Sequence, residues 1–324
     1  MDEFDAMSMS PVTLTVGTFN IYNTTARYPE RKAILSKAVG QLLGRCHVLG
    51  VQEVGANQLE TLGVRIIDMN FAKILHAPLE QPIVAPSDPS FSIAGNAILI
   101  SHLSYGQGFM WVAKPDSHKT LALSPQRVVQ TTRICHMATG IEIVVANTHL
   151  HWSTNPLGVS SREDAALRGE QLKRSLEWVE DGVSSGTTIV FLGDFNSFFD
   201  DEETFSLFCE RGYFSSHKAK HGHEAVTVPT PLEAPTILPE SVVEQQADLV
   251  MVRGGVRDGD TETRVRVKSC YLANEVSATD KSLCASDHFS VTAEIEVRPM
   301  GVGPGTQAEI DHIKMMREQA RGAG

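Results

Sequence analysis

A set of polar residues shares one placement in the sequence: each stands where an apolar, strand-like segment begins or ends. The set is Asn20, Glu53, His149, Asp194, Asn196, Asp248, Asp287 and His288. One such residue alone is usually a cap or turn residue. Complementary residues at many strand ends are harder to explain in that way, because the strand ends of a packed sheet share one edge, where ligand sites form. The pattern therefore predicts a polar site at that edge.

The residue types in this set favour a metal-assisted hydrolytic reaction. Glu53 and Asp287 supply hard carboxylate oxygens, while Asn20 and Asn196 can add neutral oxygens or hold a carboxylate in place. This inventory suits Mg²⁺ or Mn²⁺, an ion that keeps several waters and takes one or two carboxylates from protein. Such an ion can neutralise a phosphate and stabilise a leaving oxygen.

Other members of the set are candidates for proton transfer. A buried Asp248 would polarise His288, so that its imidazole could take a proton from water or stabilise a phosphate. Asp194 is the second candidate for orienting or deprotonating the attacking water. The segment 189–199, IVFLGDFNSFF, shows the placement most clearly, because an apolar run gives way directly to Asp194 and Asn196.

Hydrophobic periodicity predicts the elements that would position these residues. The expected strands are 12–21, 47–54, 93–101, 126–135, 141–149, 188–193, 247–252, 263–271 and 289–297. One helix is expected from Pro29 to a stop at Gly44, and a second begins at a capping box of Ser161 with Asp164. Many strands and few helices indicate two packed sheets with helices outside.

Two long segments are expected to be surface loops. Residues 76–90 carry four prolines, and residues 215–246, which are polar and interrupted by proline, would form an active-site or surface loop. The histidines at 217–223 allow a zinc interpretation, which we disfavour because the loop lacks convergent carboxylates; contact with substrate phosphate is the other interpretation. We expect residues 1–11 to be flexible, residues 12–298 to form one domain, and the tail at 299–324 to be flexible or weakly helical.

Composition limits the class of protein. The chain has 324 residues, of which 42% are hydrophobic, enough for a large core. Its net charge is −11, so a nucleic-acid substrate would need a local basic lining. Five scattered cysteines without a CxxC pair disfavour a disulfide framework and fit a reducing compartment. With no signal peptide and no apolar run of ~20 residues, we expect an intracellular protein, cytoplasmic or nuclear, without membrane insertion.

Taken together, the motifs resemble those of the endonuclease/exonuclease/phosphatase superfamily. TFNIYN, LGVQEV, GNAILIS, VVANTHL, FLGDFNS, ADLVMV and CASDHFSV occur in that family's order and at roughly its spacing, between residues 12 and 298. Any one of these short motifs is weak evidence for the family, whereas the combination of GDFN with SDH, QE and NTHL is specific to it. The resemblance implies the DNase I-like fold, a four-layer α/β sandwich of two packed mixed β-sheets flanked by helices. NTHLHW and YPERKAIL further resemble the deadenylase-like branch.

The resemblance also implies roles for the metal-side residues. Glu53 corresponds to the principal ligand of the metal ion, and Asn20 lies beside it on the metal side. Asp287 corresponds to an additional carboxylate on the metal or phosphate side. The implied cofactor is Mg²⁺, for which Mn²⁺ can substitute.

The implied catalytic residues are Asp194, Asn196, His149, Asp248 and His288. Asp194 and Asn196 correspond to the pair that orients the attacking water and contacts the phosphate. His149 corresponds to a phosphate-contacting histidine, and Asp248 with His288 to a hydrogen-bonded dyad.

Three further residues are weaker candidates for substrate contact. Arg127 would contact a phosphate or form a structural salt bridge. His151 shares a strand face with His149, so it would reach the site or stand at its rim. Trp152 would stack on a base or pack in the core or at the rim.

These observations predict a divalent-metal-dependent phosphoesterase that hydrolyses phosphodiester bonds, foremost of nucleic acid or nucleotides, by in-line attack of water. A small-molecule or lipid-headgroup phosphoesterase, of the inositol phosphate or sphingomyelin kind, is the alternative, and a non-catalytic scaffold is another. A metallo-β-lactamase-type hydrolase is disfavoured, because Ser153 and Thr154 stand where its Asp-His pair should follow THLHW. No obligate protein partner is evident, and the choice between exo- and endo-cleavage stays open.

Overall fold

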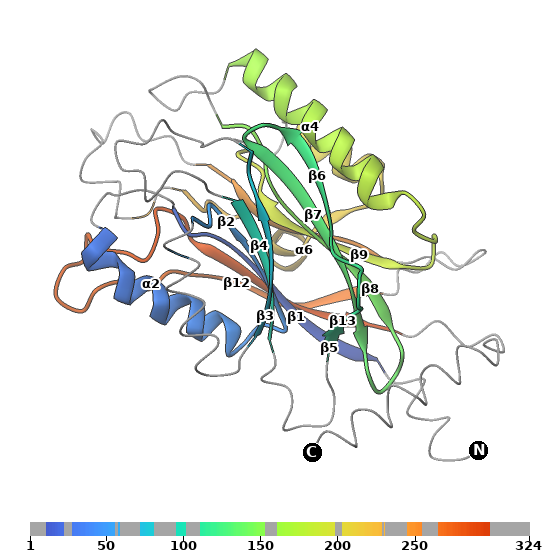
Figure 1. Ribbon diagram of the computed structural model, residues 1–324, viewed down its shortest axis with the longest axis horizontal. Coiled ribbons are helices and arrows are strands. Elements are labelled where there is room, and N and C mark those ends of the chain that lie inside the picture. The colour runs from blue at the N-terminus through green and yellow to red at the C-terminus, as the bar shows by residue number, and fades with distance from the viewer. Residues whose placement is uncertain are drawn as a thin grey trace.

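Two β-sheets pack face to face, and helices cover their outer faces, giving four layers (Figure 1). The structure is a computed structural model that describes residues 11–22, 28–55, 58, 72–80, 95–101, 111–152, 161–197, 203–228, 230, 245–254 and 265–298. The expected flexible segments at 1–10 and 299–324 lie outside these residues. The α/β sandwich predicted from the sequence is confirmed.

The first sheet has six strands in the order β12-β13-β1-β2-β4-β3. Their bounds are β1 Val12–Asn20, β2 Val48–Gln52, β3 Ala72–Pro78, β4 Gly95–Ser101, β12 Val265–Ala273 and β13 Ser290–Val297. β1 pairs with β2 in parallel, and the register sets Asn20 opposite Gln52. Asn20 and the following Glu53 therefore reach the same edge of this sheet.

The second sheet has seven strands, ordered β10-β11-β9-β8-β7-β5 with β6 also paired to β7. Their bounds are β5 Trp111–Ala113, β6 Lys119–Ser124, β7 Arg127–His136, β8 Glu142–His149, β9 Thr188–Asp194, β10 Phe214–Ser215 and β11 Asp248–Arg253. The parallel pairing of β8 with β9 sets His149 opposite Asp194, and the antiparallel pairing of β11 sets Asp248 opposite Asp194. Strand register alone thus gathers three of the predicted site residues.

Alternating side chains of the strands divide the apolar core into layers. Val190 and Leu192 of β9 pack between the sheets against Leu14 and Val16 of β1. The intervening Phe191 points to the opposite face, into the cluster beneath the outer helices. A strand buried on both faces explains why 188–193 reads as a continuous apolar run.

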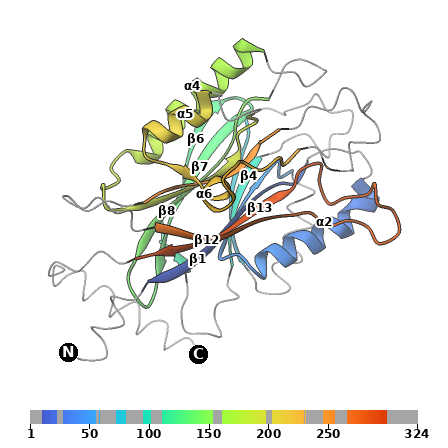
Figure 2. The same ribbon diagram turned by 180° about the vertical axis from the view of Figure 1, so that it is seen from behind.

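Helices shield both outer faces of the sandwich. α2, Tyr28–Leu43, lies on the first sheet, while α4, Arg162–Glu180, and α5, Glu203–Glu210, lie side by side on the second (Figures 1 and 2). The predicted capping box at the start of α4 is confirmed, with Ser161 and Asp164 bonded in both directions. No helix in the described ranges has the length and apolar character needed to cross a membrane.

The prediction of a surface loop at 76–90 is wrong for its first residues, because the chain up to Pro78 belongs to β3. β3 is the last strand of its sheet, and Pro78 is its final residue. A proline at the end of an edge strand removes no necessary ladder hydrogen bond, so it does not exclude a strand there. Residues 81–90 lie outside the described part of the chain.

The expected loop at 215–246 is also wrong at its start. Ser215 ends β10, and a short helix, α6, spans Ser216–His221. The Ser215 side chain accepts a hydrogen bond from Lys218 N, a helix cap that proline content and polarity do not reveal. Most of the remainder, residues 231–244, lies outside the described ranges.

The sequence analysis did not anticipate β5, β6 or α5. β5 has three residues and α5 has eight. β6 is exposed at half of its positions and shows no regular alternation. Elements this short or this exposed carry a weak periodic signal, which explains why they were missed.

The close approach of the sheets at Gly50 leads to a stability prediction. A Cβ at Gly50 would lie 2.8 Å from Asn147 Oδ1 and 3.0 Å from Leu192 Cβ, both on the facing sheet. Gly50→Ala should therefore lower the free energy of unfolding by about 1–3 kcal/mol, as overpacked cores do. A Cβ at the exposed Gly40 of α2 meets nothing within 4 Å. Gly40→Ala should stabilise the protein by about 0.5–1 kcal/mol.

Urea denaturation of the two variants and the parent chain measures both effects. Equal stability of Gly50→Ala and Gly40→Ala would show that the sheets do not approach as closely as described.

Candidate active site

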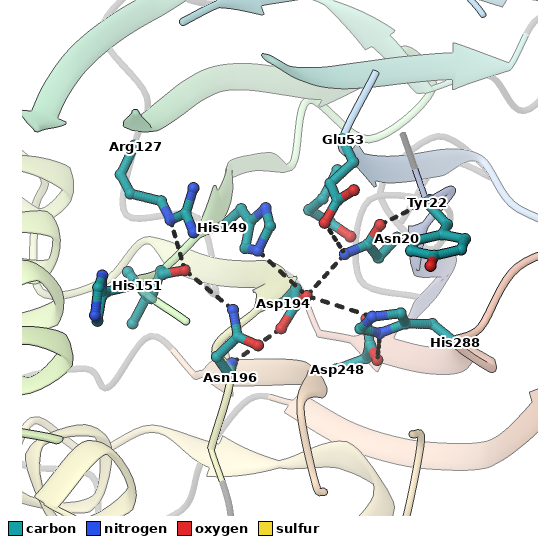
Figure 3. A network of polar contacts seen from close by, with 12 residues as sticks. Asn20, Tyr22, Glu53, Arg127, His149, His151, Asp194, Asn196, Asp248 and His288 are labelled. Atoms are coloured by element: carbon teal, nitrogen blue, oxygen red, sulfur yellow. Dashed lines mark hydrogen bonds and ion pairs between the residues drawn. The ribbon is translucent and has the colours of Figure 1, made fainter. Parts of the chain in front are cut away.

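Polar residues from both sheets meet around the Asp194 carboxylate at one edge of the sandwich (Figure 3). The first sheet contributes residues at the end of β1, after β2 and before β13: Asn20, Glu53, Asp287 and His288. The second contributes residues at the ends of β8 and β9 and at the start of β11: His149, Asp194, Asn196 and Asp248. The structure thus brings together the strand-end residues on which the sequence analysis rested.

Asp194 is the centre of this network and is only 1% exposed. Its Oδ2 accepts a hydrogen bond of 2.8 Å from Asn20 Nδ2. The same oxygen lies 3.5 Å from His149 Nε2 and 3.8 Å from His288 Nε2. Oδ1 accepts a bond of 2.9 Å from the backbone N–H of Asn196. The carboxylate is therefore held by both of its oxygens.

The surroundings of Asp194 change its proton affinity. Burial raises the pKa of Asp194 to about 7, and the neighbouring Asp248 carboxylate adds to the rise. The cation of His288 and hydrogen bonds from Asn20 and Asn196 oppose it. A carboxylate with a pKa near neutrality can both accept and release a proton, as a general base requires.

His288 and Asp248 form a hydrogen-bonded dyad. His288 Nδ1 donates to Asp248 Oδ2 over 2.8 Å. Burial lowers the pKa of His288, but the carboxylates of Asp248, Asp287 and Asp194 outweigh burial and raise the pKa well above its ordinary value. In this environment His288 is a cation, with Nε2 turned toward Asp194 and Asp287 at 3.8 Å from each.

His149 stands on the other side of Asp194 with the opposite charge state. Burial, followed by the positive charges of Arg127 and neighbouring histidines, lowers the pKa of His149 well below its ordinary value. The ring is therefore neutral, and its Nε2 faces the Asp194 carboxylate. One neutral and one charged imidazole thus flank the same carboxylate.

Asn20 connects Asp194 to Glu53. Its Nδ2 also donates to Glu53 Oε1 over 3.2 Å, and its Oδ1 accepts from the backbone N–H of Tyr22 over 2.9 Å. Glu53 has a φ of 59°, in the left-handed region that a glutamate rarely adopts. Such strain costs about 1–3 kcal/mol and persists only where the surroundings enforce it. The strained backbone directs the Glu53 carboxylate toward the site.

The oxygen donors on this side fit a hard divalent cation. Glu53 offers a carboxylate whose Oε1 is held by Asn20, and oxygen donors of this kind are those that Mg²⁺ or Mn²⁺ prefers. The Asp287 carboxylate lies beside His288, with 3.8 Å between Oδ1 and Nε2. Ligand atoms of Asp194, Asp248 and His288 also lie within 4.8 Å of one another. His288 Nδ1 is already engaged by Asp248, and the surrounding carboxylates raise the pKa of His288, which disfavours this ring as a ligand and makes Glu53 the stronger candidate.

Ser286 is a site residue that the sequence analysis missed. Its Oγ donates to Asn20 O over 2.7 Å, lies 3.2 Å from Asp287 Oδ1, and accepts from His288 N over 3.2 Å. The serine therefore joins the end of β1 to the turn that carries the dyad histidine. In the sequence, only its position directly before Asp287 and His288 indicated that Ser286 could belong to the site.

Asn147 is a second missed residue, and it fastens the two sheets beneath the site. From β8 its Nδ2 donates to Val51 O and Ala97 O of the first sheet, at 3.1 Å and 3.0 Å. Its Oδ1 accepts from Gln52 Nε2 over 2.6 Å. The sequence signal was its shared strand face with His149, which identified the face but not the partners.

Arg127 and Asn196 both donate to one backbone oxygen. Arg127 Nε reaches Leu150 O over 2.8 Å, and Asn196 Nδ2 reaches the same oxygen over 3.1 Å (Figure 3). Arg127 Nη1 donates to Gln126 O. These bonds support the loop that follows β8, so the structure gives both side chains a positioning role beside the cluster.

His151 points away from the Asp194 network in the close-up of Figure 3. Its Nε2 lies 2.8 Å from Asp164 Oδ1, in the capping box of α4. The structure therefore does not bring His151 into the cluster. Trp152 is 48% exposed at the same end of β8.

Comparisons with known proteins agree with this geometry. The sequence model of the Endonuclease/Exonuclease/phosphatase family matches residues 17–288. No curated protein sequence matches significantly. The chain resembles the crystal structure of an endonuclease/exonuclease/phosphatase from Bacteroides vulgatus, with 17% identity, a TM-score of 0.62, and coverage of 89% of this chain and 100% of that one.

Two further solved structures share the fold. TDP2 of D. rerio in complex with a single-strand DNA product has 14% identity and a TM-score of 0.63, covering 87% of this chain and 98% of that one. The human nocturnin catalytic domain with bound sulfate has 14% identity and a TM-score of 0.62, covering 89% and 96%. At these identities the likeness concerns the fold alone.

The opposite charge states of the two histidines can be measured directly. Because three carboxylates surround His288 and burial beside Arg127 disfavours a charge on His149, the two pKa values should lie on opposite sides of about 6.5, the ordinary value. In the metal-free protein, at a pH equal to the ordinary histidine pKa, His149 should therefore be neutral while His288 is protonated.

NMR titration of ¹³C-labelled histidine, assigned with His149→Gln and His288→Gln, tests this expectation. Asp248→Asn should lower the pKa of His288 and change that of His149 much less. Coincident titration of the two rings would contradict the arrangement described.

Proposed function

Because this chain belongs to the endonuclease/exonuclease/phosphatase family, we propose that it is a metal-dependent phosphodiesterase acting on nucleic acid or nucleotides. Members of the family are generally hydrolases of phosphoester bonds. The observation that carries the proposal is the contact set of Asp194, which lies 2.8–3.8 Å from Asn20, His149 and His288. A general base, a neutral imidazole and a cationic imidazole together meet the needs of phosphodiester hydrolysis.

In this proposal Asp194 accepts a proton from the attacking water. Its pKa near 7 lets a substantial fraction be ionised at neutral pH while keeping the carboxylate basic. His288, charged and oriented by Asp248, donates to phosphate oxygens as negative charge develops there. Neutral His149 adds a second N–H donor on the other side of Asp194.

Glu53 is the proposed principal ligand of Mg²⁺, with Mn²⁺ as a substitute, and Asp287 is a second oxygen donor. Asn20 keeps the Glu53 carboxylate in place through the 3.2 Å hydrogen bond. When bound, the ion supplies charge neutralisation of the phosphate and stabilisation of the leaving oxygen.

Two observations support a polynucleotide or nucleotide substrate. D. rerio TDP2, which has the same fold, was captured with a single-strand DNA product. Trp152 is the one exposed aromatic side chain with large apolar area among the described residues, and such rings stack on nucleobases. The net charge of −11 is the observation that favours a small phosphate ester instead.

The experiment is hydrolysis of a substrate panel with Mg²⁺, Mn²⁺ or EDTA. The panel holds single-stranded RNA, single- and double-stranded DNA, an inositol polyphosphate and a generic diester. We expect metal-dependent cleavage of a polynucleotide, and the product ladder separates exo- from endo-cleavage. Turnover of the inositol polyphosphate alone would favour the small-molecule alternative, and no turnover at all would favour a non-catalytic scaffold.

Glu53→Gln should lower kcat by at least about 10²-fold, because it removes the charged ligand of an ion that stabilises the transition state. It should also raise the Mg²⁺ concentration needed for half-maximal activity, while the melting temperature stays close to that of the parent chain. Glu170→Gln, a change on the exposed face of α4, is the matched control. Undiminished turnover by Glu53→Gln would remove Glu53 from the metal site.

The pH dependence of kcat/KM should reflect the ionisation of Asp194 and His288, whose pKa values are both raised. Asp194 must be ionised to accept a proton, so the rate should fall as pH drops below about 7. His288 must stay protonated, so the rate should fall again at high pH, where that proton is lost. His288→Ala should lower the rate by about 10²–10⁴ and remove the high-pH limb. A low-pH limb that persists in Asp194→Asn would assign it to another group.

A further inference from the structure

One buried threonine is hydrogen-bonded on both sides of the dyad that Asp248 and His288 form. Thr227 is 0% exposed and belongs to the described part of the segment 215–246. Its side-chain Oγ1 accepts a hydrogen bond of 3.0 Å from Asp248 N. Its backbone oxygen accepts a bond of 2.9 Å from the N–H of Phe289, the residue that follows His288. Thr227 therefore joins the start of β11, in one sheet, to the turn before β13, in the other.

The N–H of Asp248 points away from its partner strand β9 and toward this threonine. On that side of β11, the neighbouring strand β10 is paired further along, at Met251 and Val252. The Thr227 hydroxyl oxygen takes the place of a strand carbonyl and accepts the bond. A buried backbone N–H that loses its acceptor is destabilised, so this oxygen fixes where the backbone of Asp248 lies.

The position of the Asp248 backbone matters because its carboxylate is held by one oxygen. Oδ2 accepts the 2.8 Å hydrogen bond from His288 Nδ1 (Figure 3). Oδ1 is buried and has no hydrogen-bond partner among the described residues. The distance between the carboxylate and the imidazole therefore depends on where the two backbones are anchored.

The backbone around His288 is anchored by the same short segment of chain. Thr230 Oγ1 donates to Ser286 O over 2.7 Å, and Thr230 N donates to Asp287 O over 2.9 Å. With the bond from Phe289 N to Thr227 O, the residues before and after His288 are both fixed. The part of the predicted loop that carries Thr227 and Thr230 thus supports the dyad from behind.

We propose that Thr227 is a positioning residue that sets the separation between the Asp248 carboxylate and the His288 imidazole. Its hydroxyl oxygen acts through Asp248 N, and its backbone oxygen acts through Phe289 N. A displacement of about 1 Å can cost an enzyme much of its rate, so the anchor should matter for turnover. The consequence for turnover rests on the proposed function, whereas the consequence for the dyad hydrogen bond does not.

Thr227→Val removes the hydroxyl and keeps the branched shape, whereas Thr227→Ser keeps the hydroxyl. The first readout is the NMR signal of the His288 Nδ1 proton in the metal-free protein, which lies at low field in an imidazole–carboxylate hydrogen bond. His288→Gln assigns this signal by removing it. We expect the parent signal in Thr227→Ser, and in Thr227→Val a signal that moves upfield or is lost by exchange with water.

Thr204→Val is the matched control. Thr204 of α5 is also 0% exposed, and its hydroxyl has no hydrogen-bond partner among the described residues. The same substitution at this position therefore removes a buried hydroxyl without removing a contact to the dyad. Thr204→Val should keep the parent proton signal and the parent kcat.

The second readout is steady-state kinetics with a substrate cleaved in the panel. Thr227→Val should lower kcat by up to about 10²-fold. KM and the Mg²⁺ concentration for half-maximal activity should stay at the parent values, because the Glu53 side is unchanged. Thr227→Ser should restore kcat. A threonine with only a structural role would lower the melting temperature and leave the kcat of the folded protein unchanged.

Circular dichroism checks folding, and Thr227→Ala, which removes the same hydroxyl from a smaller side chain, replaces Thr227→Val if that variant does not fold. A parent-like proton signal in the folded variant without the hydroxyl would overturn the inference. Thr227→Ser that behaves as Thr227→Val does would also overturn it, because the effect would then come from the lost methyl packing. Absence of phosphodiesterase activity in the parent chain would count against the proposed function, and the proton signal would still test the positioning of the dyad.

Discussion

The hydrogen bond between Asn20 and Asp194 joins the two β-sheets at the edge where the candidate active site lies. Behind it, Asn147 spans the same gap and bonds two carbonyl groups of the first sheet. These polar contacts fix how the sheets sit on each other, and the apolar side chains between them supply the driving force for packing. The site exists only in the closed sandwich, because neither sheet alone holds both a candidate metal ligand and the candidate general base.

Burying the charged groups of this site lowers the stability of the folded protein. Asp194, Asp248 and His288 are all buried, and charges removed from water are tolerated only where they compensate one another. Here a cationic imidazole offsets the carboxylates around it, and Glu53 adds backbone strain. The apolar layers between the sheets and beneath the helices on both outer faces provide the folding free energy that offsets this cost. Conflict of this kind between stability and function is common at active sites.

Strand ends and motif order predicted the sandwich and pointed to the polar residues that lie together around Asp194, because period-two patterns and polar breaks are local signals within one sequence. The sequence analysis missed Asn147 and Ser286, because their roles depend on hydrogen bonds to backbone carbonyl groups of distant strands. His151 was expected either to reach the site or to stand at its rim, and its partner Asp164 is a tertiary contact that periodicity does not reveal. α6 was hidden by its shortness and by the prolines that follow it in the sequence.

The position of β1 between β2 and β13 has a consequence for the order of events on the ribosome. Asn20 and Asp194 are 174 residues apart in sequence, and Ser286 binds Asn20 O across 266 residues. Contacts this distant form slowly, and β1 must wait unpaired on one side until β13 has been synthesised. A nascent chain therefore carries an open sheet edge for most of its synthesis, and the candidate active site can be completed only after the segment leading into β13 has been made.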